Sequence, residues 1–182
     1  MAVQVTLSMS LDGYITGPKV SADLPLGTAA NVLRPGGDLH KPQDILAVTG
    51  ATVVGRTIYD HTDGWGEEPP FRMPVFVVTH RARPVRIAGE TTFTFVGSVA
   101  EAVAEAKQAA GDKDVYIGGG ASIADQALNL DLVDELFLYI EPVLLGGGTR
   151  LFASLEERQI TLERVRAVEA PISTHIHYRV LR

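Results

Sequence analysis

Three consecutive glycines, Gly118, Gly119 and Gly120, follow a short apolar run at residues 115–117 and precede a helical pattern at 122–130. A strand that ends in glycines at the start of a helix exposes backbone N–H groups and the positive end of the helix dipole. Because the glycines lack Cβ atoms, a pyrophosphate can approach this backbone closely. The chain lacks the G-x-G-x-x-G dinucleotide motif. The run therefore predicts either a phosphate-binding turn or a tight turn without a ligand.

A second strand–glycine–helix pattern occurs earlier in the chain. The apolar run at residues 51–54 is followed by Gly55, Arg56 and Thr57. The guanidinium offers a rigid fork of donors that suits phosphate, and the threonine adds a hydroxyl. A surface arginine beside a turn glycine is the alternative. Two such sites in one sheet favour the ligand interpretation, because each phosphate group needs a site of its own.

A third candidate binding sequence is Thr79-His80-Arg81, which ends the apolar run at residues 75–79. A hydroxyl, an imidazole and a guanidinium at a strand end suit a ribose phosphate, which would favour NADP over NAD. Polar residues are also usual at strand ends, so this pattern has an ordinary explanation as well.

The elements that must position these residues alternate between strand and helix. Period-two alternation predicts a strand at residues 3–7, and Ser98 with Glu101 predicts a capping box for a helix over 99–110. Further strands are expected at 51–54, 75–79, 93–96, 115–117, 133–140, 160–168 and 174–181, and helices at 28–33, 45–48 and 122–130. Residues 18–40 and 60–74 are expected to be mostly loop. One α/β domain with a mixed sheet, parallel in its middle and ending in an antiparallel hairpin, accounts for this order.

The composition is that of a globular protein, with 46% hydrophobic and 21% charged residues in a chain of 182. The absence of cysteine excludes disulfides, thiolate nucleophiles and thiolate metal sites, and no metal site is expected. A formal charge of −6 argues against nucleic-acid binding, which needs a cationic surface. The N-terminus lacks a signal-peptide pattern, and no apolar stretch reaches the roughly 20 residues of a membrane span. We therefore expect a cytoplasmic protein.

The motifs, in this order and spacing, resemble the dihydrofolate reductase superfamily. The resemblance is stronger to the reductase domain of bacterial riboflavin biosynthesis, the RibD C-terminal family. It is carried by Ser10-Leu11-Asp12-Gly13-Tyr14-Ile15, Val54-Gly55-Arg56-Thr57, Pro74-Val75-Phe76-Val77-Val78-Thr79-His80-Arg81, residues 115–120, and residues 131–152 with Pro142-Val143-Leu144-Leu145-Gly146-Gly147-Gly148. The resemblance implies a three-layer dihydrofolate reductase-like fold, with a central, mostly parallel sheet between helices.

The resemblance also implies an NADPH site and hydride transfer to a C=N or C=O carbon. The residues implied for the cofactor phosphates are Gly55, Arg56 and Thr57, and those for the adenosine ribose and its 2′-phosphate are Thr79 with His80 or Arg81. Those implied for the pyrophosphate are Gly118, Gly119, Gly120, Ala121, Ser122 and Ile123, and those for the nicotinamide are Ser8, Met9, Ile15 and Gly17. The protein's part is to stack the two ring systems and to exclude water.

Two departures from the family pattern bear on the substrate. Dihydrofolate reductases carry an acid before the Gly-Arg-Thr motif, and here Asp38 or Asp44 would have to fill that role, although each is also explained as a helix N-cap or first-turn acid. The riboflavin enzyme usually carries a zinc deaminase domain with paired cysteines, which a chain without cysteine cannot contain.

Other side chains are candidates for the substrate side of the site. Trp65 either stacks on a heterocycle or belongs to a lid packed on the core, and Tyr139 matches a position where dihydrofolate reductases place a hydroxyl beside the substrate. Glu141 is a titratable group near the expected cleft. The alternating His175 and His177 have a spacing that could bind metal, but a solvated or interface face is favoured.

The sequence thus predicts an NADPH-dependent reductase of a small heterocycle, of the 5-amino-6-(5-phosphoribosylamino)uracil reductase type. Dihydrofolate reductase-like activity, an NADPH-binding paralogue without efficient catalysis, and a flavin-using oxidoreductase are the alternatives. The resemblance implies a homodimer, and the apolar run at residues 136–145 is a candidate for its interface.

Overall fold

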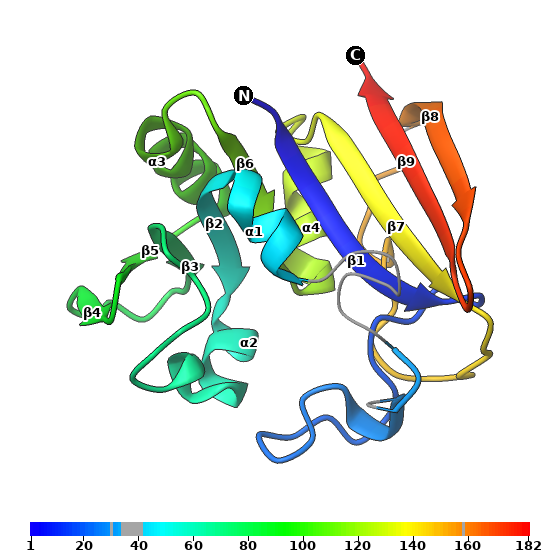
Figure 1. Cartoon of the computed structure of the whole chain (residues 1–182), viewed down its shortest axis with the longest axis horizontal. Coiled ribbons are helices and arrows are strands. Elements are labelled where there is room, and N and C mark those ends of the chain that lie inside the picture. The colour runs from blue at the N-terminus through cyan, green and yellow to red at the C-terminus, as the bar shows by residue number, and fades with distance from the viewer. Residues whose placement is uncertain (30, 34–41, 158) are drawn as a thin grey trace.

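The computed structural model describes the chain except for residues 30, 34–41 and 158. Its strands are β1 (Val3–Ser10), β2 (Thr49–Gly55), β3 (Val75–Val78), β4 (Arg86–Ala88), β5 (Thr91–Val96), β6 (Asp114–Ile117), β7 (Glu135–Glu141), β8 (Thr161–Glu169) and β9 (Thr174–Leu181). Its helices are η1 (Gly27–Ala29), α1 (Pro42–Val48), α2 (Arg56–His61), η2 (Asp63–Trp65), α3 (Val99–Ala110) and α4 (Ala121–Asn129) (Figure 1).

The nine strands form one sheet in the order β4-β5-β3-β2-β6-β1-β7-β9-β8. The six strands from β5 to β7 in this order run parallel to one another. β4 is antiparallel at one edge, and the β9–β8 hairpin is antiparallel at the other. The predicted mixed sheet, mostly parallel and ending in an antiparallel hairpin, is confirmed.

Helices cover both faces of the sheet, with α3 and α4 on one face and α1 on the other (Figure 1). On the α3–α4 face, Val5, Val53 and Ile117 are fully buried against alanines of the two helices. On the α1 face, a second apolar cluster gathers Val54, Val77 and other side chains of β2, β3 and β5, and Leu46 of α1 packs on it. The two apolar layers fix β2 and β6 at the centre of the molecule.

The start of α3 shows how local sequence sets an element. The Ser98 hydroxyl accepts from the Glu101 amide at 3.2 Å, as expected of an N-cap. The Glu101 carboxylate accepts from the amide of Gly97 at 2.9 Å, one residue earlier than in the predicted capping box. Both bonds satisfy amides at the beginning of the helix.

The structure differs from the sequence prediction in three short elements. Residues 60–74, expected as loop, contain the end of α2 and all of η2. β4 was not predicted, and a helix expected at 28–33 is reduced to the single turn η1. These pieces are held by tertiary contacts and carry too few residues for a periodic signal. In the described part of the chain, no helix is both long enough and apolar enough to cross a membrane.

Candidate functional site

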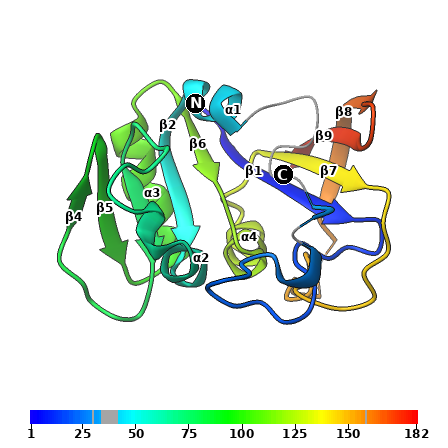
Figure 2. The same ribbon diagram turned by 60° about the horizontal axis from the view of Figure 1, so that its bottom comes forward.

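The two predicted phosphate motifs lie side by side. The Gly55 amide, at the end of β2, donates to the Gly119 carbonyl at 2.8 Å, and the Gly118 amide donates to the Val53 carbonyl at 3.0 Å. Figure 2 shows the tips of β2 and β6 next to each other, each followed by a helix. From β2 the chain continues toward β3, and from β6 it crosses β1 to reach β7. Ligand crevices in open α/β sheets form at the carboxyl ends of strands where connections diverge in this way.

The three glycines after β6 occupy three different environments. A Cβ atom on Gly118 would lie 2.9 Å from Cε1 of Tyr116, so this glycine makes room for the tyrosine ring. Gly119 has φ of +119°, a conformation that side chains disfavour, and its peptide bond to Gly120 is cis. A Cβ on Gly120 would have nothing within 4 Å. Only at Gly120 does the absence of a side chain leave open space, at the start of α4.

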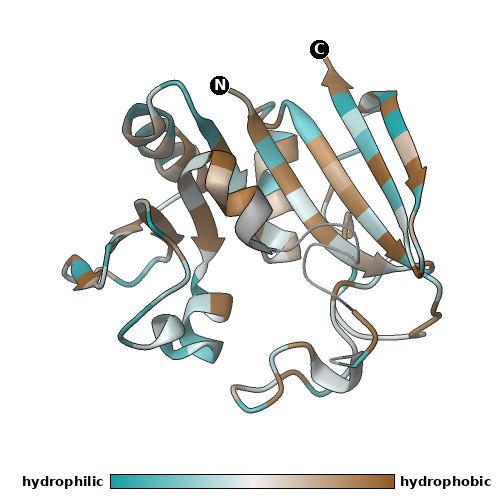
Figure 3. Ribbon diagram, viewed as in Figure 1, coloured by the Kyte–Doolittle hydropathy of each residue, from teal (hydrophilic) through white to brown (hydrophobic). Residues whose placement is uncertain are grey.

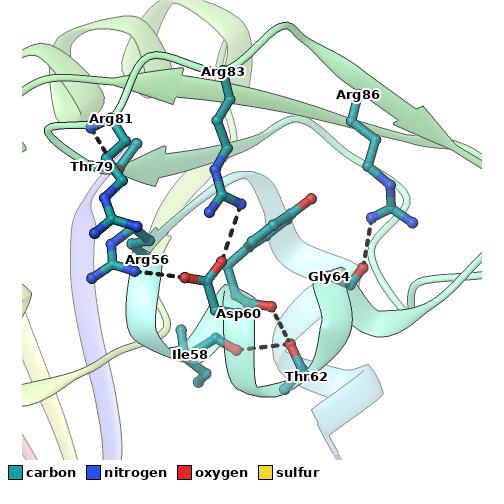
Figure 4. Close-up of polar contacts among 10 residues, drawn as sticks. Arg56, Ile58, Asp60, Thr62, Gly64, Thr79, Arg81, Arg83 and Arg86 are labelled. Atoms are coloured by element: carbon teal, nitrogen blue, oxygen red, sulfur yellow. Dashed lines mark hydrogen bonds and ion pairs between the residues drawn. The ribbon is translucent and has the colours of Figure 1, made fainter. Parts of the chain in front are cut away.

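A cluster of arginines surrounds Asp60 beside these strand ends (Figure 4). Nη1 of Arg56 lies 2.7 Å from Oδ2 of Asp60, and Nη1 of Arg83 lies 3.1 Å from Oδ1. The backbone amide of Arg81 donates to the Thr79 hydroxyl at 3.1 Å. In Figure 4 the Arg81 side chain extends toward that of Arg56. The cluster therefore presents several guanidinium donors around a single carboxylate.

Polar and aromatic side chains form the α1-side face of the neighbouring strands, where Figure 3 shows alternating hydrophilic and hydrophobic bands on β1, β7 and β9. Ser8 of β1 pairs with Tyr139 of β7, which pairs with His175 of β9. Ser10 pairs with Glu141, whose side chain is 1% exposed. Since side chains two apart share a face, these groups lie on one face of the sheet.

Two phenols and an imidazole define the chemistry of that surface. Burial raises the pKa of Tyr139 to about 12, and burial together with the charge of Tyr139 raises the pKa of Tyr116 to about 12. Both hydroxyls are neutral at physiological pH and can donate a hydrogen bond. The His175 ring lies 4.4 Å from the Tyr139 ring, and its Nε2 is 2.9 Å from the Ser173 hydroxyl. Both rings are almost fully buried, since Tyr139 is 5% and His175 is 6% exposed.

Residues 1–174 match the sequence pattern of the RibD C-terminal domain. The chain belongs to the RibD C-terminal domain family. Its similarity to the uncharacterized protein YwjB of Bacillus subtilis is 25% identity over 139 residues, covering 72% of this chain and 75% of YwjB. A local match of 46 residues is 48% identical to the uncharacterized protein YyaP of the same organism and covers only 24% of YyaP.

Solved structures agree with this membership. A proposed riboflavin biosynthesis protein from Shewanella sp. PV-4 matches over the full length of both chains with 26% identity and a TM-score of 0.77. Dihydrofolate reductase from Enterococcus faecalis, solved with NADP(H), matches over 100% of this chain and 97% of its own, with 18% identity and a TM-score of 0.64. A deaminase/5-amino-6-(5-phosphoribosylamino)uracil reductase from Thermotoga maritima matches with 14% identity and a TM-score of 0.68, and this chain spans 56% of it. The RibD C-terminal domain therefore has a dihydrofolate reductase-like fold and belongs to a riboflavin-pathway reductase-like family.

The residues expected around the nicotinamide are only partly brought together in this RibD C-terminal domain. Ser8 lies on the same face as Tyr139, whereas Met9, one residue along β1, points to the opposite face and lines a cavity of about 520 Å³ with Arg150. Ile15 is buried in the core on the α3–α4 side. A Cβ on Gly17 would lie 2.6 Å from the Thr28 hydroxyl oxygen, so this glycine is needed for packing against η1. Strand alternation separates Ser8 from Met9.

The first turn of α4 offers fewer donors than the motif predicts. The side chains of Ala121 and Ile123 are buried in the core, and Ile123 packs on Gly55. The Ile123 amide already donates to the Gly120 carbonyl at 3.0 Å. The Ser122 hydroxyl accepts from the Gln126 side chain at 3.0 Å. The amides of Ala121 and Ser122 are therefore the donors that this turn offers to an anion.

Trp65 belongs to an aromatic cluster of the core. Its ring is edge-on to Phe71 at 4.8 Å and stacked with Phe93 at 6.3 Å. Phe93 is on β5, and four strands separate β5 from β7 with its Tyr139 and Glu141. This packing matches the alternative in which Trp65 packs on the core, rather than the one in which it stacks on a heterocycle. Asp38 lies outside the described residues.

One expectation about the C-terminal strands is wrong. His175 is 6% exposed, so it does not lie on a solvated or interface face, and His177 stacks on Phe137 with ring centroids 4.1 Å apart. The predicted alternation does bring the histidines to one face, where each pairs with an aromatic residue of β7. In the apolar run at residues 136–145, Leu136 and Leu138 are buried in the molecule's own core and Leu144 is exposed, and a dimer interface there stays a prediction.

Three residues of this region had no role in the sequence interpretation. Asp60 and Arg83 join the arginine cluster, and Tyr116 lies over Gly118. The spacing of four between Arg56 and Asp60 on a helix was a usable signal. No signal in the sequence pointed to Arg83, because Arg83 reaches Asp60 only through the fold of the segment after β3.

Proposed function

We propose that this protein is an NADPH-dependent reductase of a small heterocyclic substrate. The observation that carries the proposal is the meeting of two glycine-ended parallel strands with an arginine cluster at one edge of the sheet. Gly55 and Gly119 are hydrogen-bonded to each other, Arg56 follows Gly55 in the chain, and the Arg81 side chain extends toward that of Arg56. A dinucleotide with a diphosphate and an additional phosphate is the cofactor that needs both features.

The described residues fit that cofactor. The open space at Gly120 and the amides of Ala121 and Ser122 suit the pyrophosphate. Arg56, with Thr79 and Arg81, suits the ribose 2′-phosphate, while Thr57 and His80 are exposed at the same edge. When bound, NADPH supplies a hydride.

The chain's own residues have binding and positioning roles in this reaction. Ser8 and the Tyr139 phenol lie on the surface where the substrate would stack, and Tyr139 can donate a hydrogen bond to a heteroatom of the substrate without ionising. Glu141 adds a carboxyl at the end of β7, on the same face. The sheet excludes water from one side of the stacked rings.

Family membership favours a riboflavin-type substrate, a 5-amino-6-(5-phosphoribosylamino)uracil or a close analogue. Dihydropterins are the second substrate class, because the fold is shared with dihydrofolate reductase. The homodimer that the resemblance implies and the cytoplasmic location that the sequence predicts are part of this proposal, and light scattering of the purified protein tests the dimer.

The test of this function has a binding arm and a turnover arm. Calorimetric titration with NADPH should give saturable binding, and NADPH absorbance should fall when phosphoribosylaminouracils or dihydropterins are added. Arg56→Ala should weaken NADPH binding by about 1.5–3 kcal/mol, the value of a charge-assisted hydrogen bond. Absence of NADPH binding by the unmodified protein would overturn the proposal, and binding without turnover of either class would leave a cofactor-binding paralogue.

A further inference from the structure

Asp60 holds two arginines that come from different parts of the chain. Arg56 is one turn earlier on α2, whereas Arg83 lies in the segment between β3 and β4. Each guanidinium contacts a different oxygen of the carboxylate, and in each case Nη1 is the nitrogen involved. The other nitrogens of both guanidiniums remain as donors for a further acceptor. Asp60 therefore fixes the two forks relative to each other while using one nitrogen of each.

Arg83 is also restrained from the core side. Its guanidinium carbon lies 5.8 Å from the ring centroid of Tyr59 and 5.6 Å from that of Phe95, within the range of cation–π contacts. Tyr59 is the residue before Asp60, so the ring and the carboxylate both contact Arg83 from α2. The side chain is about one-third exposed, as Arg56 and Asp60 also are. The cluster is therefore ordered and still reachable by a ligand.

The charges of the cluster match a phosphomonoester. Arg56 and Arg83 contact Asp60, and the Arg81 side chain extends toward Arg56 in Figure 4, so the three guanidiniums of the cluster outnumber this carboxylate by two. A phosphomonoester carries about −1.5 to −2 at neutral pH. NADH has a hydroxyl where NADPH has this group, so it offers the cluster no charge to neutralise.

We propose that Asp60 is a positioning residue that sets the preference for NADPH over NADH by holding Arg56 and Arg83 ready for the 2′-phosphate. This inference rests on the proposed function. Without the carboxylate, two rotamer-rich side chains would have to be ordered when the phosphate binds, and that ordering lowers affinity. The penalty falls on NADPH alone, because NADH does not engage the cluster.

The test compares Asp60→Asn with the unmodified protein and with Asp63→Asn, using calorimetric titration with NADPH and with NADH. Asp63 lines a cavity of about 370 Å³ together with Asp60 and Arg83, but among the described residues no ion pair joins Asp63 to Arg56 or Arg83. Asp60→Asn should weaken NADPH binding about tenfold and leave NADH binding within about twofold. Asp63→Asn should change neither affinity, and Asp60→Glu should restore part of the preference. NADH binding reports whether each variant has kept its fold.

Arg83→Gln supplies a second variant, which should lower NADPH affinity selectively in the same way. Unchanged or tighter NADPH binding in Asp60→Asn would overturn the inference, and tighter binding would mean that the carboxylate competes with the phosphate. Equal losses for NADPH and NADH would also overturn it. If the unmodified protein binds neither dinucleotide, the proposed function itself fails. If the unmodified protein binds NADPH and Asp60→Asn binds it equally well, only the role of Asp60 fails.

Discussion

Alanine substitutions at Gly118 and Gly120 separate a structural glycine from a ligand-facing one. At Gly118, a Cβ would lie 2.9 Å from the Tyr116 ring, so Gly118→Ala should destabilise the protein by about 1–3 kcal/mol through overpacking. For a chain of this length, each kcal/mol lowers the melting temperature by about 2–4 °C. The ring would have to move, and the adjacent strand end with it.

At Gly120 the same change should leave stability nearly constant. No atom lies within 4 Å of the point that the new methyl group would occupy, and φ of −82° is accessible to alanine. The loss of chain entropy in the unfolded state favours alanine by about 0.4–1 kcal/mol, and alanine's poorer performance as an N-cap offsets a similar amount. NADPH affinity should nevertheless fall at least about tenfold, because the methyl group occupies the approach path of the pyrophosphate.

The assay pairs thermal unfolding with calorimetric NADPH titration for both variants. A double-mutant cycle with Tyr116→Ala should show coupling at Gly118 and none at Gly120. NADPH binding by Gly120→Ala as tight as that of the unmodified protein would contradict a ligand-facing role for Gly120. Equal losses of stability in the two glycine variants would contradict the structural role of Gly118.

Three further predictions concern the site and its supports. Tyr139→Phe should lower kcat/KM for the substrate about tenfold, the value of one hydrogen bond, at unchanged NADPH affinity; a change in NADPH affinity would contradict this assignment. Folding raises the pKa values of Tyr116 and Tyr139 from 10.0 to about 12, so the stability they contribute is complete below pH 10.0 and is lost as the pH rises toward 12. Urea unfolding across this range should show a decline in stability that Tyr116→Phe and Tyr139→Phe reduce. A decline that the two variants leave unaltered would contradict this prediction. The buried Asp125, which is 1% exposed, accepts hydrogen bonds from the amides of Phe152 and Ser154 at 3.0 and 2.9 Å. Asp125→Asn should lower the free energy of unfolding by about 1–3 kcal/mol, as measured by thermal unfolding. An unchanged melting temperature would show that these bonds are dispensable.

The sequence predicted the backbone of the site well, because short motifs at strand ends report directly on local structure. Gly55 ends β2 and Gly118 follows β6 as expected, and the parallel sheet brings their turns together. What the motif could not show is which glycine faces open space. In the fold, a Cβ on Gly118 would meet the Tyr116 ring, whereas one on Gly120 would have nothing within 4 Å.

Side-chain direction was the main source of error. Ser8 and Met9 were both assigned to the nicotinamide ring, although the side chains of adjacent strand residues point to opposite faces of the sheet. The contact between Arg83 and Asp60 spans two separate segments and is created by the fold alone. The contact of the His175 ring with Tyr139 arises from the pairing of β9 with β7, which requires the strand order to be known.

A crystal structure of the NADPH complex tests the proposed cofactor site most directly. We expect the pyrophosphate at Gly120 and the first turn of α4, the 2′-phosphate among Arg56, Arg81 and Arg83, and the nicotinamide beside Ser8. A dinucleotide bound away from the β2 and β6 strand ends, or a 2′-phosphate that contacts none of the clustered arginines, would contradict this placement.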